Sequence, residues 1–299
     1  MFTTALLILP DFMLIALGGL LLKVMGFSSE FFRHIEKLVY YLFFPSLLFY
    51  SIAHTSLEGG QTLLLFAGVA GVILVGALCG WLALLFMRDR TLTHASVVQC
   101  AFRFNTYLAL SLAFELGHEE GLGLMSVIVG LAVPLVNTLA VYALARGRGL
   151  GVGVELIKNP LILAAVLGLI WNFLGLSLPK PIDVSLSRLG SCALPLGLLC
   201  VGATLSLRAL YGEQKLVGWM VVSKLLALPL AAVGIALLLD FTPLEANMLI
   251  LFAAIPTASS AHVLAARMGG NAELVATTMS AGTLLSVLTL PLCIRYLFI

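Results

Sequence analysis

Residues 62–87 read TLLLFAGVAGVILVGALCGWLALLFM, a run of 26 residues without a charged side chain. About 20 apolar residues are enough for an α-helix to cross the hydrocarbon core of a bilayer. A soluble protein would rarely bury so long an apolar run completely. The stretch therefore predicts a transmembrane helix.

The whole 299-residue chain has the same character, with 61% hydrophobic residues, 10% charged residues and a mean hydropathy of +1.13. Soluble domains contain about 25% charged residues, so we expect an integral membrane protein embedded in the lipid bilayer. The net charge of +2, without any run of basic residues, argues against a nucleic-acid partner. The five cysteines lie in apolar stretches without metal-ligand spacing, so we expect no metal and no cofactor.

Apolar stretches of membrane-spanning length recur along the chain, and we expect ten of them. The predicted spans lie near residues 5–22, 38–54, 62–87, 94–116, 122–145, 156–176, 184–206, 216–239, 246–266 and 272–297. No Lys or Arg precedes Lys23, so the first stretch is predicted to be a retained helix rather than a signal peptide.

Basic residues in the predicted connections give the orientation, because cytoplasmic loops are enriched in Lys and Arg. The odd-numbered connections hold eleven of them: Lys23, Arg33, Lys37, Arg88, Arg90, Arg146, Arg148, Lys158, Arg208, Lys215 and Arg267. The even-numbered connections and the termini hold three: Lys180, Arg188 and Arg295. This imbalance predicts a multi-pass protein of the cell (inner) membrane with both termini extracytoplasmic.

The two halves of the chain resemble each other at a shift of 150 residues, which places Pro10 on Pro160 and Pro45 on Pro195. Five spans per half is an odd number, so the second half would enter the membrane upside down. We therefore predict an all-α fold of ten transmembrane helices with a 5+5 inverted repeat. Its parts are a first repeat at 1–145, a cytoplasmic linker at 146–154 and a second repeat at 155–299. Chance similarity between apolar helices is the alternative.

The most polar mid-membrane stretches lie in the fourth span of each half, at 100–107 and 255–262. Polar groups in hydrocarbon are costly unless they face a partner or a wet cavity, and Pro256 removes a backbone donor. We expect the fourth and ninth helices to break and cross there, with their half-helix N-termini facing one site that favours anions. Pro45 and Pro195 mark further predicted helix breaks.

Four motifs, in the same order, resemble the auxin efflux carrier family of the bile acid/arsenite/riboflavin transporter-type superfamily. They lie at residues 37–49, 102–110, 194–205 and 255–265, and the resemblance spans nearly the whole chain. It implies a scaffold domain and a transport domain, with two helices crossing at prolines. Bacterial members of the family are associated with the transport of small carboxylates such as malonate or malate.

The chain departs from the family at three positions in the two crossing segments. Ala109 and Ser111 stand where the family often has Gly and Pro, so we expect a less sharply broken first crossing. Ser260 stands where an Asn is typical, which weakens the family's polar clamp.

The candidate substrate-binding residues are Arg103, Asn105, Thr106, Pro256, Thr257, Ser259, Ser260 and His262. Asn105 can donate and accept at once, although a structural amide is the alternative. Ser and Thr hydroxyls also bond back to their own helices. His262 titrates near neutrality and is a candidate proton carrier, but we favour a core histidine. Pro134 and Asn137 in the fifth span are weaker candidates.

Four charged residues within or near the ends of spans are open to two interpretations. For Arg103 and Lys224 we favour snorkelling to the interface. A fixed counter-charge to an anionic substrate is the alternative for Arg103. For Asp11 and Glu115, near the outer ends of their spans, we favour simple solvation, so no carboxylate is expected at the middle of a span.

Sequence motifs of hydrolases, metalloproteases and nucleotide-binding enzymes are absent in a suitable context, so we do not expect an enzyme. We expect a secondary transporter that moves a small organic anion, a mono- or dicarboxylate, by alternating access. A sodium-coupled organic-anion symporter of bile-acid-carrier type is the first alternative. A membrane-embedded enzyme or a sensor is the alternative from another class. Coupling to H⁺ or Na⁺ and assembly into a homodimer stay open.

Overall fold

The computed structural model describes the chain except residues 1, 55–58, 86–90, 146–159, 206–212 and 259. No strand occurs among the described residues, which confirms the all-α class. The α-helices are α1 (Phe2–Lys23), α2 (Ser29–Leu38), α3 (Phe44–His54), α4 (Gly59–Leu82), α5 (Thr91–Val97), α6 (Thr106–Ala145), α8 (Pro160–Phe173), α9 (Lys180–Ser191), α10 (Ala193–Thr204), α11 (Gln214–Val222), α12 (Leu228–Leu238), α13 (Pro243–Ala254), α14 (Ser260–Arg267) and α15 (Ala272–Tyr296). Two π-helices, η1 (Val39–Phe43) and η4 (Ser223–Ala227), and two 3-10 helices, η2 (Ala83–Leu85) and η3 (Val98–Ala101), complete the series. The predicted linker at 146–154 lies outside the described residues.

Six segments of the described chain are long and apolar enough to cross a membrane. They are Ser29–His54, Leu63–Leu85, Thr93–Leu144, Lys180–Thr204, Gln214–Leu238 and Ala272–Tyr296. Two shorter apolar helical segments, Leu163–Phe173 and Pro243–Ala254, accompany them. The long segment Thr93–Leu144 is not one straight helix, because its backbone unwinds before Thr106 and turns sharply at His118, where φ is 49°.

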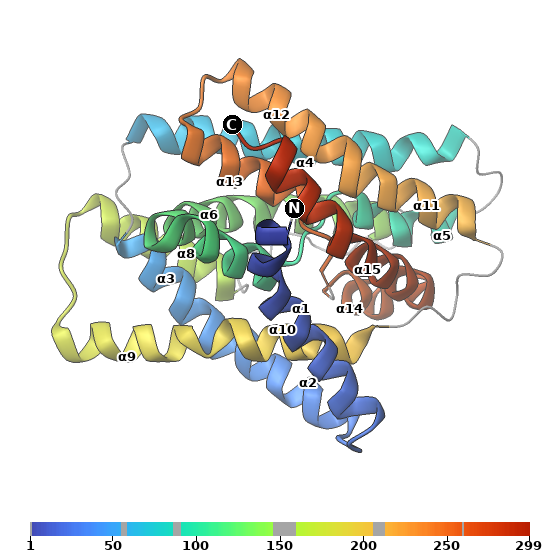
Figure 1. Ribbon diagram of the computed structural model, residues 1–299, viewed down its shortest axis with the longest axis horizontal. Coiled ribbons are helices and arrows are strands. Elements are labelled where there is room, and N and C mark those ends of the chain that lie inside the picture. Colours follow the sequence, from blue (N-terminus) through green and yellow to red (C-terminus); the bar gives the residue numbers. More distant parts are fainter. Residues whose placement is uncertain (1, 55–58, 86–90, 146–159, 206–212, 259) are drawn as a thin grey trace.

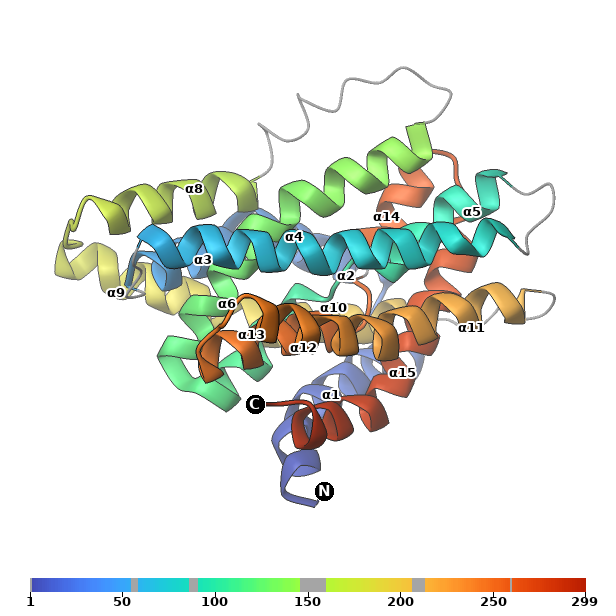
Figure 2. The ribbon, with the colours of Figure 1, turned by 90° about the horizontal axis from the view of Figure 1, so that it is seen from above.

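The helices pack in two groups. The first, called the scaffold group here, contains α1, α2, α3, α8, α9 and α10, with α1 packed on α10 and α3 packed on α8 and α9. The second, called the crossing group, contains α4 to α6 and α11 to α15, with α12 packed on both α4 and α13, and its helix α6 also packs on α3 and α8 of the scaffold group. In Figure 1, α2, α3, α9 and α10 run through the lower part and α4, α11, α12 and α13 through the upper part. Figure 2 shows α4 and α12 side by side again in the perpendicular view.

Glycines allow the scaffold helices to approach closely at two matching places. A Cβ atom at Gly18 of α1 would collide with the backbone of Leu199 in α10. A Cβ atom at Gly168 of α8 would lie 3.3 Å from the backbone oxygen of Phe49 in α3. A shift of 150 residues converts one of these contacts into the other, with the roles of the two halves exchanged.

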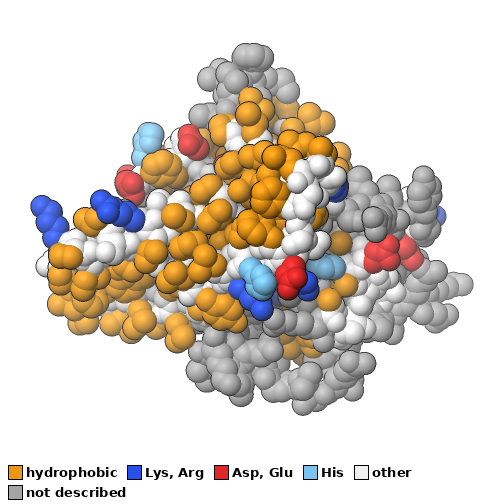
Figure 3. Space-filling view, turned by 90° about the horizontal axis from the view of Figure 1, so that it is seen from below, with side chains coloured by type: hydrophobic (Ala, Val, Ile, Leu, Met, Phe, Trp, Pro, Cys, Tyr) orange, Lys and Arg blue, Asp and Glu red, His pale blue; other side chains and the backbone are white. Residues whose placement is uncertain are grey.

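The outer surface carries many large apolar side chains. Leu63, Leu78, Leu167, Leu230 and Leu288 are each about half exposed or more. Figure 3 shows one face of the molecule, where orange apolar side chains cover broad areas and the charged groups gather in a few places. Such a surface is stable in contact with lipid tails and not with water.

Candidate functional site at the crossing of two unwound segments

Two unwound backbone segments meet inside the crossing group. The first, 102–105, lies between η3 and α6, and the second, 255–258, lies between α13 and α14. The backbone N–H of Asn105 donates to the carbonyl of Pro256 at 2.7 Å, and Thr257 Oγ1 donates to the carbonyl of Cys100 at 2.7 Å. These bonds satisfy polar groups that unwinding leaves without helical partners, which is what permits irregular backbone at membrane depth. The predicted crossing of the two polar stretches is therefore present.

The first segment is unwound over 102–105 and the second over 255–258, and the expectation of a less sharply broken first crossing than in the family stays a prediction. The first break ends at Asn105, before the two positions where the family has Gly and Pro. Small residues of α4 allow this irregular backbone to pack closely. Cβ atoms at Gly76 and Gly80 would lie 2.9 Å from the carbonyl oxygen of Ala101 and 3.1 Å from that of Val98. The helix is therefore broken by its neighbours as much as by its own sequence.

Asn105 begins α6 and is almost fully buried, with 1% of its surface exposed. Its Oδ1 accepts hydrogen bonds from the backbone N–H groups of Tyr107 at 3.1 Å and Leu108 at 3.3 Å, as an N-cap residue does. Its Nδ2 is buried without a hydrogen-bond partner. A buried donor without a partner is costly, so this amide is free to bind a ligand. Asn105 thus caps α6 with its oxygen and leaves its amide donor without a partner in the described part of the chain.

Arg103 is 5% exposed and does not snorkel, contrary to our expectation. Its Nη1 donates to Ser260 Oγ at 3.0 Å and its Nη2 to Asn137 Oδ1 at 2.9 Å, while Nε is buried without a partner. The crossing brings these acceptors to the guanidinium, which therefore need not reach the interface. Both acceptors are neutral, so neither compensates the positive charge. Because Ser260 itself is exposed, the guanidinium lies one hydrogen bond away from an accessible side chain.

The remaining predicted residues lie at or beside the crossing. Thr106 is the first residue of α6, Pro256 is buried in the second unwound segment, and Thr257 is 5% exposed. Ser259 lies outside the described residues. His262 is half-buried on α14, and one ring nitrogen, Nδ1, lies 3.0 Å from the carbonyl oxygen of Ala272, as a structural histidine would.

Lys224 also does not snorkel, again contrary to our expectation. It is 2% exposed, and its Nζ donates to the carbonyl of Ala253 at 2.9 Å in the last turn of α13. The ammonium also lies 5.8 Å from the ring centroid of Phe252. A cation at the C-terminal end of a helix stabilises the exposed carbonyls there. Lys224 therefore holds the end of the half-helix that leads into the second break.

Pro256 lies in a break, whereas Pro45 and Pro195 only disturb helices that continue. Pro45 follows the π-helix η1 and is the second residue of α3. Pro195 is the third residue of α10, just after a one-residue interruption at Cys192. The wider π-turn before Pro45 accommodates the carbonyl that a proline ring would otherwise meet.

The simple solvation expected for the two carboxylates holds for Glu115, which is exposed, and fails for Asp11. Asp11 lies near the middle of α1, is 5% exposed, and accepts a hydrogen bond from Ser111 Oγ at 2.6 Å. A buried carboxyl group thus occurs near the middle of the first predicted span, against our expectation.

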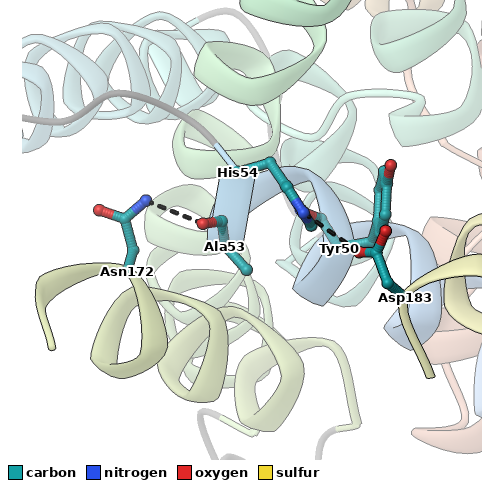
Figure 4. Close-up of polar contacts among 5 residues, drawn as sticks. All are labelled: Tyr50, Ala53, His54, Asn172 and Asp183. Carbon is teal, nitrogen blue, oxygen red and sulfur yellow. Dashed lines mark hydrogen bonds and ion pairs between the residues drawn. The ribbon is translucent and has the colours of Figure 1, made fainter. Parts of the chain in front are cut away.

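A second polar cluster, shown in Figure 4, lies within the scaffold group and not at the crossing. His54 Nε2, at the end of α3, lies 3.1 Å from Asp183 Oδ1 of α9. Asn172 Nδ2, near the end of α8, donates to the carbonyls of Ile52 and Ala53. These bonds tie α3 to α8 and α9, so we interpret the cluster as structural.

Sequence reasoning gave too little weight to two residues of the crossing. Asn137 was a weaker candidate, and its contact with Arg103 bridges 34 positions of the chain. Gln99 was not considered, although it is fully buried and its Nε2 donates to the carbonyls of Ser96 and Ala261. A lone amide in an apolar run was the available signal for Gln99.

Comparisons with known proteins agree with this architecture. Residues 149–294 match the family described as "Membrane transport protein". An "Uncharacterized transporter" of Methanothermobacter thermautotrophicus is 29% identical over 94% of both chains. A protein of Rhizobium meliloti named "Putative malonate transporter" is 27% identical over 95% of this chain and 92% of its own length. An "Uncharacterized transporter" of Escherichia coli is 23% identical over 96% of this chain and 95% of its own.

The matched family and these relatives are transporters and not enzymes, as the sequence predicted. Together with the apolar helices and the crossed, unwound segments, they establish a multi-pass integral membrane protein. Residues 149–294 are thus similar to the membrane transport protein family, and the chain as a whole is similar to proteins that are named as transporters.

Proposed function

We propose that the protein is a secondary carrier that moves a small carboxylate across the cell membrane by alternating access. The observation that carries this proposal is the buried guanidinium of Arg103, whose two hydrogen-bond partners are both neutral. A buried charge without a counter-charge is costly, and a carboxylate would supply that charge. Arg binds carboxylates in a fork geometry, and its Nε has no partner.

Two further features of the crossing suit an anion. Asn105 Nδ2 is a second buried donor without a partner. The N-terminal ends of α6 and α14 both begin at the crossing, and such ends carry partial positive charge. The Rhizobium meliloti relative, whose name specifies malonate, supports a dicarboxylate as the substrate. We assign Arg103, Asn105 and Ser260 as the residues that contact it.

The same proposal includes ten transmembrane helices in two inverted repeats, at 1–145 and 155–299, with both termini extracytoplasmic. The exchanged contacts of Gly18 with Leu199 and Gly168 with Phe49 support the repeat, because a two-fold axis between halves generates such pairs. The two packing groups support a scaffold domain and a transport domain. Alternating access would then be a movement of the crossing group against the scaffold group.

The test is binding and exchange of malonate by purified protein. Titration calorimetry should detect binding to the wild type, and liposomes loaded with malonate should take up labelled malonate by exchange. Arg103→Gln keeps hydrogen-bonding capacity and removes the charge. A hydrogen bond to a charged group contributes about 1.5–3 kcal/mol, so its loss should weaken binding about 10- to 150-fold.

Arg188→Gln is the matched control, because Arg188 is an exposed arginine on α9. This variant should bind malonate as the wild type does. Equal malonate affinity of the wild type and Arg103→Gln would refute the proposed site. No binding of any mono- or dicarboxylate by folded wild-type protein would refute the substrate class.

A further inference from the structure

Asp11 has an unusual environment for a carboxyl group. It is 5% exposed, its Oδ1 accepts a hydrogen bond from Ser111 Oγ at 2.6 Å, and its Oδ2 is buried without a hydrogen-bond partner. An ionised carboxylate buried in this way would lack compensation on one oxygen. A proton on Oδ2 removes that charge.

Among the residues that the structure describes, no ion pair involves Asp11. Helix α1 packs against α6, α10 and α15. On α6, the charge of Glu115 acts on Asp11 with the same sign. Helix α10 carries no charged residue, and its one titratable side chain, Cys200, bonds to the carbonyl of Phe32.

Helix α15 carries four titratable or charged side chains: Glu273, Cys293, Arg295 and Tyr296. Glu273 and Arg295 are exposed, and the Arg295 guanidinium lies 5.4 Å from the ring centroid of Tyr296. Neither forms an ion pair with Asp11 in the described part of the chain. Hard cations take six or more oxygen ligands, whereas one carboxyl and one hydroxyl meet here. The site therefore suits a proton.

The Asp11–Ser111 hydrogen bond joins the two helix groups, because α1 belongs to the scaffold group and α6 to the crossing group. Ser111 lies on α6, the helix that Asn105 caps, on the same face as the exposed Glu115 and one turn before it. A movement of α6 along α1 would break this bond. The carboxyl group of Asp11 would then lose its buried position.

We infer that Asp11 is the proton site that couples carboxylate transport to H⁺. This inference rests on the proposed function and deepens it. In the conformation described, Asp11 carries a proton and bonds to Ser111. When the groups move, the bond to Ser111 breaks and the carboxyl group releases its proton to water on one side of the membrane. When the groups return, the carboxylate takes up a proton from water on the other side. One H⁺ then crosses with each cycle.

An infrared titration tests the proton site without any substrate. At about pH 5, where an ordinary aspartate is ionised, the wild type should show the carbonyl stretch of a protonated carboxylic acid, and Asp11→Asn should lack it. Glu119→Gln, the same change at an exposed carboxylate of α6, should keep the band. Ser111→Ala keeps the acid and removes its hydrogen bond, so it should shift the band. A band unchanged in both Asp11→Asn and Ser111→Ala overturns the proposal.

Transport in liposomes tests the coupling. With an imposed pH gradient, the wild type should accumulate malonate above equilibrium, whereas Asp11→Asn should reach only the equilibrium ratio. Malonate exchange without a gradient requires no net proton movement and should persist in Asp11→Asn. Accumulation by Asp11→Asn equal to that of the wild type overturns the inference. Absence of malonate exchange by the wild type instead overturns the proposed substrate, and the infrared band then decides on the proton site alone.

Discussion

Asn105 offers a substitution that separates stability from binding, because its two side-chain atoms have different tasks. Its Oδ1 caps α6 through Tyr107 and Leu108, and its Nδ2 has no partner. Asn105→Ser keeps an oxygen that can cap and removes the amide donor. Asn105→Ala removes both.

The structure gives the expected size of each effect. Loss of an N-cap costs about 0.5–2 kcal/mol, so Asn105→Ala should lower the free energy of unfolding by that amount. Asn105→Ser should be at least as stable as the wild type, because it also removes a buried donor without a partner. If Nδ2 donates to a bound carboxylate, both variants lose a charge-assisted bond of about 1.5–3 kcal/mol. Malonate affinity should then fall about 10- to 150-fold in both.

The measurements are thermal unfolding of the detergent-solubilised variants and calorimetric titration with malonate. The informative variant is Asn105→Ser, in which stability and affinity should separate. Wild-type affinity in Asn105→Ser, together with lower stability in Asn105→Ala, would mean that Asn105 is only a helix cap. The reasoning that assigns it to the substrate would then be wrong.

Three further predictions concern packing, the crossing and orientation. Gly18→Ala should destabilise the protein by about 1–3 kcal/mol, because its Cβ would collide with α10. Gly234 has open space around it, so Gly234→Ala should be neutral or stabilising, and thermal unfolding of the two variants compares them. Thr257→Val should lower stability by about 1–3 kcal/mol, because it leaves the carbonyl of Cys100 without its side-chain donor; unchanged thermal unfolding would contradict that role. A reporter fused after Ile299 should be active only in a form that works outside the cytoplasm, and activity of a cytoplasm-only reporter would contradict the orientation.

The sequence predicted the helical class and the place of both breaks for a clear physical reason. Polar residues and Pro256 are costly inside a membrane helix, so a polar run such as Arg103 to Thr106 marks a place where the helix has other partners. The shift of 150 residues predicted that the two breaks occupy corresponding places in the two halves. The first break begins at residue 102, so the shift places the second at 252, and the structure has it at 255. Local patterns were therefore sufficient to find the crossing.

The partners of the buried charges could not be predicted from the sequence. Snorkelling was expected for Arg103 and Lys224 from their depth alone, but their acceptors come from other segments of the chain, including Asn137 and Ala253. Asp11 was expected to be solvated because it lies near the outer end of its predicted span, yet it is buried and bonds to Ser111, one hundred residues away in sequence. Contacts between distant segments determine whether a charged side chain in a membrane protein is buried or solvated, and these contacts cannot be read from one sequence.

Access to Ser260 tests the central claim that the crossing is a carboxylate site reached from one side of the membrane at a time. Ser260 is exposed and bonds to Arg103, so a cysteine there reports on the site directly. The experiment uses Ser260→Cys in a chain whose five native cysteines are replaced by Ala, provided that this background still exchanges malonate. A charged, membrane-impermeant thiol reagent should modify Ser260→Cys, and saturating malonate should slow the reaction severalfold by occupying the site or shifting the conformation. A reaction rate that is independent of malonate, in protein that still exchanges it, would contradict the account.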